Sequence, residues 1–147
     1  MKKGFTLLEL LIVISIIAIL AAAIIPNFIG FDSEARVATT QTNLNTLRTR
    51  VTLFRAKEGA YPATLEELLL KSYDDLGVQR PYLEKMPNEL ISSKSGNNAV
   101  ENRKFADGLI NDGGWTYIID QARVVVDVTD EMESNWGSYK GQKPSEW

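Results

Sequence analysis

The residues with the clearest chemical potential lie at the N-terminus, where Gly4, Phe5 and Glu9 follow the pair Lys2 and Lys3. Glycine lacks a Cβ, so a protease can hold the chain extended at Gly4 with little steric hindrance. Cleavage after Gly4 removes both lysines and creates an α-amine on Phe5. Because Glu9 lies one helical turn beyond Phe5, its carboxylate can face that amine or the amine of a neighbouring chain. The spacing predicts processing at Gly4 and an electrostatic role for Glu9.

Glu9 stands inside a long apolar segment. Only three of the 21 residues from Phe5 to Ile25 are polar, and as a helix the segment is roughly 32 Å long, about one bilayer core. An ionised carboxylate in hydrocarbon costs about 2.5 kcal/mol or more, so such residues usually have a function and a partner. The alternative is that Glu9 stays hydrated near the headgroups. Since the lysines precede the segment, the N-terminus is expected on the cytoplasmic side and the rest of the chain outside.

The string Lys-Lys-Gly-Phe-Thr-Leu-Leu-Glu at residues 2–9 resembles the class III leader of type IV pilins and type II secretion pseudopilins. The resemblance implies that residues 1–4 are a leader, that a prepilin peptidase cuts between Gly4 and Phe5, and that Phe5 is then N-methylated. It also implies that assembly needs Glu9. We expect Glu9 to pair with the Phe5 amine of an adjacent subunit.

Pro26 follows the apolar helix and cannot donate a hydrogen bond to the carbonyl four residues before it. The family often has a proline here, where the helix bends or melts in filaments. A simple helix breaker at the membrane exit explains Pro26 equally well. A secretory signal cleaved near residue 24, after Ala21–Ala23, is a further alternative. Against it, the apolar run exceeds the roughly 7 to 15 residues of such a signal and contains Glu9.

The remaining residues, 31–147, have the composition of a soluble head. Apolar residues at helical spacing from Phe28 to about Lys57 predict an amphipathic helix that packs on the core of the head. These apolar residues are expected to form one stripe along the helix: Phe28, Phe31, Ala35, Val37, Ala38, Leu44, Leu47, Val51 and Phe54. Arg48, Arg50 and Arg55 lie on the other faces and are expected to be solvated or to meet acidic groups of a neighbouring subunit.

After this helix, Thr64 and Glu67 have the spacing of a capping box, which predicts a short helix from Leu65 to about Tyr73. Residues 92–114 are expected to be loop. The runs 115–119 and 123–128 predict a β-hairpin with Trp115, Tyr117 and Ile119 on the face that covers the helix stripe. The predicted fold is α+β and pilin-like: a long N-terminal helix, membrane-spanning in its first half (5–30), packed on a small antiparallel sheet. A segment around Gly59, Tyr61 and Pro62 also resembles the major pseudopilin.

Composition excludes several classes of function. The chain has no cysteine and no histidine, which removes disulfides, thiolate catalysis, histidine triads and the common zinc sites. We therefore expect no catalytic residues and no enzyme activity. With 16 basic and 19 acidic residues the net charge is −3, and the basic residues are scattered, so no nucleic-acid partner is expected.

Major pseudopilins generally carry a C-terminal loop that binds calcium. Here Asp127, Asp130, Glu131 and Glu133 form an acidic group in that region, but calcium needs about six converging oxygens, and the loop sequence of the family is not recognisable. No metal or cofactor is assigned, and calcium is kept as an alternative to a solvated strand end.

These features predict a structural subunit of a type IV pilus-like filament, in particular the major pseudopilin of a type II secretion system. A surface pilin and a membrane-anchored binding module that does not polymerise are the alternatives. The resemblance implies these partners: other copies of the chain, minor pseudopilins or pilins, the prepilin peptidase and methylase, an inner-membrane assembly platform, and lipid before assembly. The expected location is the bacterial inner membrane, with a periplasmic or extracellular filament after assembly.

Overall fold

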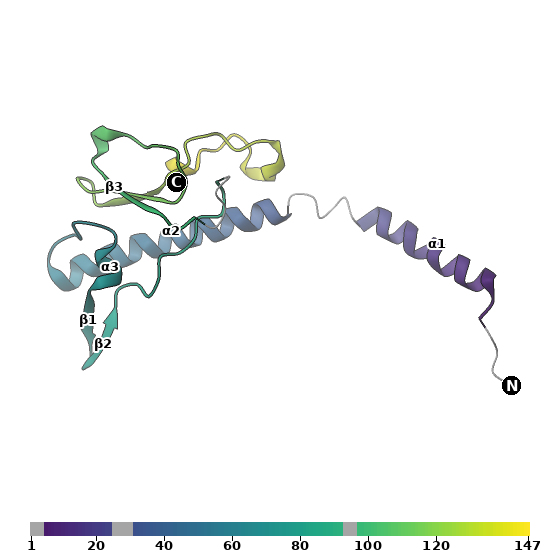
Figure 1. The fold of residues 1–147 in the computed structure, drawn as a ribbon, viewed down its shortest axis with the longest axis horizontal. Helices are drawn as coiled ribbons and strands as arrows, with labels where there is room; N and C mark the ends of the chain where they lie inside the picture. Colours follow the sequence, from purple (N-terminus) through teal and green to yellow (C-terminus); the bar gives the residue numbers. More distant parts are fainter. Residues whose placement is uncertain (1–4, 25–30, 93–96) are drawn as a thin grey trace.

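The computed structural model describes residues 5–24, 31–92 and 97–147. Gly4, Phe28 and Pro26 lie outside the described residues, so their predicted roles remain predictions. Figure 1 shows the order of the elements along the chain. The helices are α1 (Leu7–Ile24), α2 (Phe31–Glu58) and α3 (Glu67–Leu70), with the 3-10 helices η2 (Phe105–Asp107), η3 (Ser134–Tyr139) and η4 (Pro144–Glu146). The strands are β1 (Ser72–Asp75), β2 (Val78–Pro81), β3 (Val100–Arg103), β4 (Trp115–Ile118) and β5 (Arg123–Val126).

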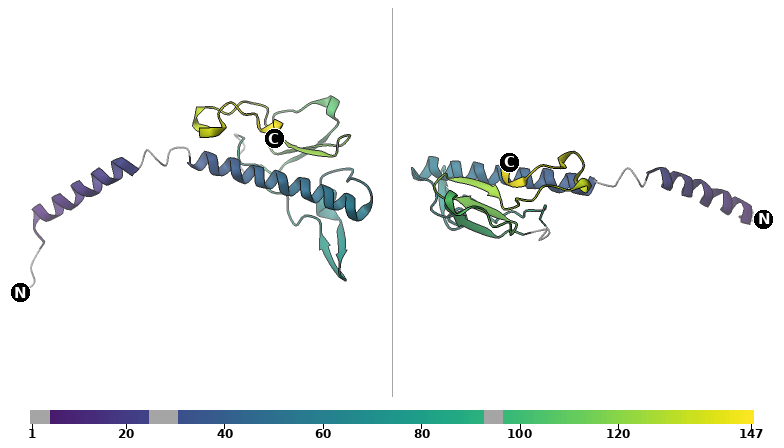
Figure 2. Two further views of the ribbon diagram at one scale, coloured as in Figure 1. Left: turned by 180° about the vertical axis from the view of Figure 1, so that it is seen from behind. Right: turned by 90° about the horizontal axis from the view of Figure 1, so that it is seen from above.

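The predicted α+β class is confirmed. The three-stranded sheet, in the order β3-β4-β5, lies on one side of α2, and the β1–β2 hairpin projects from the other side (Figures 1 and 2). Trp115 and Tyr117 of β4 are fully buried in a core that they share with α2 residues such as Leu44 and Leu47. The sheet therefore covers the apolar stripe of the helix, as the alternation of side chains along the strand predicts. Ile119, predicted on the same face, lies beyond the end of β4 and is 40% exposed.

Helix α2 confirms most of the predicted stripe and corrects one end of it. Its buried residues recur with alternating steps of three and four: Val37, Thr40, Leu44, Leu47, Val51 and Phe54. Phe31, Ala35 and Ala38 are exposed, because at about 100° per residue their positions lie roughly 150–170° around the helix from the centre of this stripe, on the opposite face. The buried position between Val37 and Leu44 is taken by Thr40, whose hydroxyl accepts a hydrogen bond from the Leu90 amide at 3.1 Å.

Arg48 was expected to be solvated or to meet acidic groups of a neighbouring subunit, but in the structure it contacts backbone carbonyls of its own chain. It is half-buried, and its guanidinium donates to the Val124 carbonyl at 3.1 Å and to the Trp147 carbonyl. Burial, with the nearby positive charge of Arg123, lowers the pKa of Arg48. This side chain thus ties α2 to β5 and to the residues after η4.

The sheet contains the predicted hairpin and one strand that the sequence did not indicate. β4 and β5 are antiparallel, with Trp115 opposite Val126. β3 falls in the region expected to be loop and pairs in parallel with β4, with Val100 opposite Trp115. The small sheet is therefore mixed, with one antiparallel and one parallel pair.

The helix predicted from Leu65 to Tyr73 is shorter than expected. α3 ends at Leu70 because Lys71 takes an extended conformation, and its capping residue Glu66 makes no side-chain cap. The Glu67 amide, predicted to donate to the Thr64 side chain, donates instead to the Thr64 carbonyl at 3.2 Å. The neighbouring Leu65 amide donates to Asn102 Oδ1 at 2.9 Å. Residues after Lys71 turn into the antiparallel β1–β2 hairpin.

Two buried tyrosines make the head sensitive to alkaline pH. Tyr82 donates to Glu58 Oε1 at 2.7 Å and Tyr117 donates to the Pro62 carbonyl at 2.9 Å. Burial raises the pKa of each hydroxyl to about 12, helped at Tyr82 by the hydrogen bond to Glu58. In the unfolded chain a tyrosine loses its proton near pH 10, so unfolding between about pH 10 and 12 releases protons and stability falls as pH rises.

We expect the melting temperature of the full-length chain in detergent to drop steeply between pH 10 and 12. Tyr82→Phe should make this drop shallower, because phenylalanine removes one of the linked protons, whereas Tyr61→Phe at an exposed tyrosine should keep the wild-type slope. Melting curves recorded by circular dichroism from pH 8 to 12 measure the slope of melting temperature against pH for the wild type and both variants. Equal slopes in the wild type and Tyr82→Phe would contradict the linkage to Tyr82.

Candidate functional site

The predicted assembly residue Glu9 closes a capping box at the start of α1. The Glu9 Oε2 atom accepts from the Thr6 amide and from the Thr6 hydroxyl, both at 2.9 Å. In return, the Glu9 amide donates to Thr6 Oγ1 at 3.2 Å. The carboxylate and the hydroxyl thus satisfy backbone donors that the first turn of a helix otherwise leaves unpaired.

Thr6 is a residue of this site that the sequence reading missed. Its signal was present, since Thr-x-x-Glu before an apolar run is the sequence pattern of a capping box. The box gives Glu9 a partner inside its own chain. Any role of Glu9 between subunits must therefore be separated by experiment from its role in capping α1.

Helix α1 carries apolar side chains on all of its faces, and they are exposed. Phe5 is 76% exposed, and every large apolar side chain between Leu7 and Leu20 is at least 46% exposed. The Ser15 hydroxyl donates to the Leu11 carbonyl one turn earlier at 2.7 Å, so it needs no partner outside the helix. Within the described part of the chain, no helix has both the length and the apolar character needed to cross a membrane.

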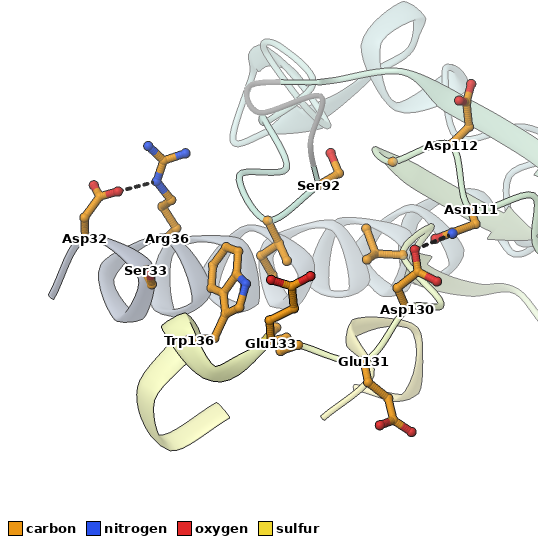
Figure 3. Close-up of a pocket in the computed structure, with 14 residues that line it drawn as sticks. Asp32, Ser33, Arg36, Ser92, Asn111, Asp112, Asp130, Glu131, Glu133 and Trp136 are labelled. Carbon is orange, nitrogen blue, oxygen red and sulfur yellow. Dashed lines mark hydrogen bonds and ion pairs between the residues drawn. The ribbon is translucent and has the colours of Figure 1, made fainter. Parts of the chain in front are cut away.

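A second feature is a hollow of about 590 Å³ beside the start of α2 (Figure 3). Asp32 and Arg36 of α2 form an ion pair at 2.7 Å on one side of it. On the other side, Asn111 Nδ2 donates to Asp130 Oδ2 at 2.7 Å. Asn111 also joins the loop before β4 to the segment after β5. Its backbone amide donates to Asp127 Oδ1 at 3.0 Å, and its side-chain Oδ1 accepts from the backbone amide of Thr129 at 2.9 Å.

The four acidic residues considered for calcium do not converge. Asp127 is fully buried, Asp130 faces Asn111, and Glu131 points away from the hollow (Figure 3). Among the residues that the structure describes, no group of three or more acidic side chains is placed to hold a metal ion. Calcium stays the alternative raised by the sequence, and a change of melting temperature on adding calcium or a chelator would support it.

The N-terminal motif and the architecture together define a class: a methylation-type N-terminus, then long helices, then a small sheet packed on the second helix. A family described as "Prokaryotic N-terminal methylation motif" matches residues 1–25. The chain is pilin-like, and its relatives are pilins and type II secretion proteins. No solved structure gives a significant match.

Three relatives illustrate the similarity. The chain is 42% identical to the type IV major pilin protein PilA of Myxococcus xanthus over 67 residues, which are 46% of this chain and 30% of that protein. It is 27% identical to the type II secretion system core protein G of Pseudomonas aeruginosa over 93 residues, 58% of this chain and 66% of the relative. It is 34% identical to the type II secretion system core protein G of Vibrio cholerae over 73 residues, which are 48% of this chain and 50% of that protein. The chain thus spans less than two thirds of each relative.

Proposed function

We propose that the chain is a structural subunit of a helical filament that polymerises through its N-terminal helix. The observation that carries this proposal is helix α1, which lies within the matched methylation motif and exposes its large apolar side chains on every face. Apolar surface of this extent requires a cover. The bilayer covers it before assembly, and the α1 helices of neighbouring subunits cover it in the filament core. The proposed anchor is residues 5–30, which includes residues beyond the described part of α1.

Within this class, the role of major pseudopilin in a type II secretion system is the one we favour. Several relatives are named core protein G of such systems, and the chain has no cysteine pair of the kind that closes a loop in many type IV pilins. A surface pilin is the second candidate, because the similarity to the Myxococcus pilin has the higher identity. Neither role involves catalysis.

The pathway that follows has defined steps. Prepilin peptidase removes residues 1–4, the new N-terminus of Phe5 is methylated, and the subunit waits in the inner membrane with its head exported. The assembly platform then moves it into the filament, where other copies and minor subunits are its partners. Glu9 pairs with the Phe5 amine of an adjacent subunit, and Pro26 allows the helix to bend.

Intact-mass and N-terminal analysis of the protein from native membranes tests this function. We expect a chain that starts at Phe5 and is heavier by one methyl group. Gly4→Val should keep its leader, because a β-branched residue hinders the extended conformation at the cleavage site, and serves as the unprocessed reference.

Two other masses would contradict the proposal. A wild-type chain that keeps residues 1–4 would favour the anchored module that does not polymerise. A chain that starts near residue 24 would indicate a secreted head without an anchor.

A further inference from the structure

The tip of the β1–β2 hairpin carries an apolar side chain in a strained and fully exposed position. Asp75 pairs with Val78, so Leu76 and Gly77 form a two-residue turn, and both have positive φ, 56° and 86°. Such a type I′ turn favours Asn-Gly or Gly-Gly, and a leucine at positive φ is strained. Leu76 is nevertheless 98% exposed. Neither the turn nor the core of the head explains a leucine here, which points to a contact outside the chain.

A matching cavity lies on the far face of the other sheet. Because Trp115 and Tyr117 face α2, the alternating residues Ile118 and Val125 face away from it. They line a cavity of about 120 Å³ with Phe105 and Leu109, and Phe105 is 61% exposed. A cavity of roughly 150 Å³ lined by apolar groups binds benzene, so this one is of a size to take the side chain of a leucine.

The charged side chains that line the cavity are opposite in sign to the two that precede Leu76 at the tip. Asp74 and Asp75 precede Leu76, and Asp75 also pairs with Arg80 at 2.8 Å within the hairpin. The described residues that line the cavity include the basic Lys104 and Arg123 and no acidic residue. An acidic apolar tip and a basic apolar cavity are complementary, which favours one orientation of contact over others.

The two surfaces lie on opposite sides of α2, because the hairpin projects on one side and the sheet of β3, β4 and β5 covers the other (Figures 1 and 2). We propose that the Leu76 tip of one subunit inserts into the Phe105 cavity of a second copy of this chain. Such a contact is heterologous and leaves a free tip and a free cavity at each end, which builds an open-ended array. The inference rests on the proposed filament function and adds to it a specific contact between the heads.

Leu76→Asn separates this contact from folding. Asparagine suits the turn better than leucine, so the variant should melt at or above the wild-type temperature. In native cells carrying the variant, we expect the amount of sedimentable filament to fall about ten-fold. Leu70→Asn is the matched control, since Leu70 is 82% exposed but lies outside the hairpin, and its filaments should equal those of the wild type.

Crosslinking provides a second readout, because the chain contains no cysteine. Oxidised filaments of the double variant Leu76→Cys, Phe105→Cys should give a ladder of dimers, trimers and longer species. The pair Leu76→Cys, Thr46→Cys, with the second cysteine on an exposed face of α2, should give none. Normal filaments of Leu76→Asn together with no ladder would overturn the contact and leave the filament function standing.

A failure of the proposed function has a different signature. If the wild-type chain forms no filaments, that function is contradicted, and the contact is then decided by oxidising the purified full-length double variant in detergent. A ladder there would retain the contact between heads, and its absence would overturn it.

Discussion

Glu9→Gln should abolish filament assembly while leaving the protein processed and in the membrane. Glutamine keeps the size and the acceptor oxygen of glutamate but removes its charge, so the Phe5 amine of the neighbouring subunit loses its partner. Removing one partner of a buried ion pair costs about 3–5 kcal/mol, which corresponds to a loss of about a hundred-fold or more in the equilibrium for adding a subunit. The measurement is the fraction of the protein in sedimented filaments against the fraction in membranes.

Because Glu9 also caps its own helix α1 through Thr6, the prediction needs a control variant that weakens the cap and keeps the charge. Thr6→Val removes the hydroxyl that bonds Glu9 and accepts from its amide, and keeps the charge of Glu9. Loss of a cap costs typically about 1 kcal/mol, and we expect the filaments of Thr6→Val to stay within about two-fold of the wild type. If Thr6→Val lost its filaments to the same degree as Glu9→Gln, the role of Glu9 would be to cap its own helix.

How well each part of this fold could be predicted depends on how local its causes are. The apolar segment, the stripe of α2 and the β4–β5 hairpin follow from side-chain periodicity within a few turns or strands, and all three patterns were readable. Thr6 was equally local, because its spacing to Glu9 is that of a capping box, but the prediction did not include it. The exposure of Phe31 follows from its position nearly opposite the buried stripe, which the helical periodicity contains but a looser count of apolar residues hides.

The elements that escaped prediction depend on contacts between distant segments. The β1–β2 hairpin includes Asp74, Asp75 and Pro81, which are poor strand residues, and its turn has leucine where asparagine is usual. β3 contains Glu101 and Asn102 and is recognisable only through its parallel pairing with β4. The charged residue Arg48 shows the same limit, since its carbonyl partners come from β5 and Trp147, far along the chain.

Glu89 is the clearest case of a residue whose role only the fold reveals. It is fully buried, and its carboxylate accepts from three backbone amides: that of Ile91, that of Ser92 at 2.8 Å and that of Gly114 at 3.4 Å. Two of these donors are local and the third belongs to the residue before β4. The side chain therefore fastens the segment after β2 to the start of the central strand β4.

Glu89→Ala should lower the free energy of unfolding of the full-length chain by about 3–5 kcal/mol. The substitution leaves three buried amides without an acceptor, and each such group costs about 1–3 kcal/mol when no water or side chain replaces the partner. Glu89→Gln should cost less, about 1–2 kcal/mol, because its oxygen still accepts from Ile91 and Ser92 while its amide group meets the Gly114 donor. The exposed Glu84→Ala is the control and should lie within about 0.5 kcal/mol of the wild type.

Urea unfolding in detergent, followed by tryptophan fluorescence, measures these differences, because Trp115 directly follows Gly114 in the core. The order wild type, Glu89→Gln, Glu89→Ala in falling stability separates loss of hydrogen bonds from loss of charge. If Glu89→Ala were as stable as Glu84→Ala, the three amides would have found other partners and the carboxylate would not hold the two segments together. Filament yield should follow the same order as stability, whereas Glu9→Gln should reduce filaments at unchanged stability of the head. That contrast distinguishes a residue that builds the subunit from one that joins subunits.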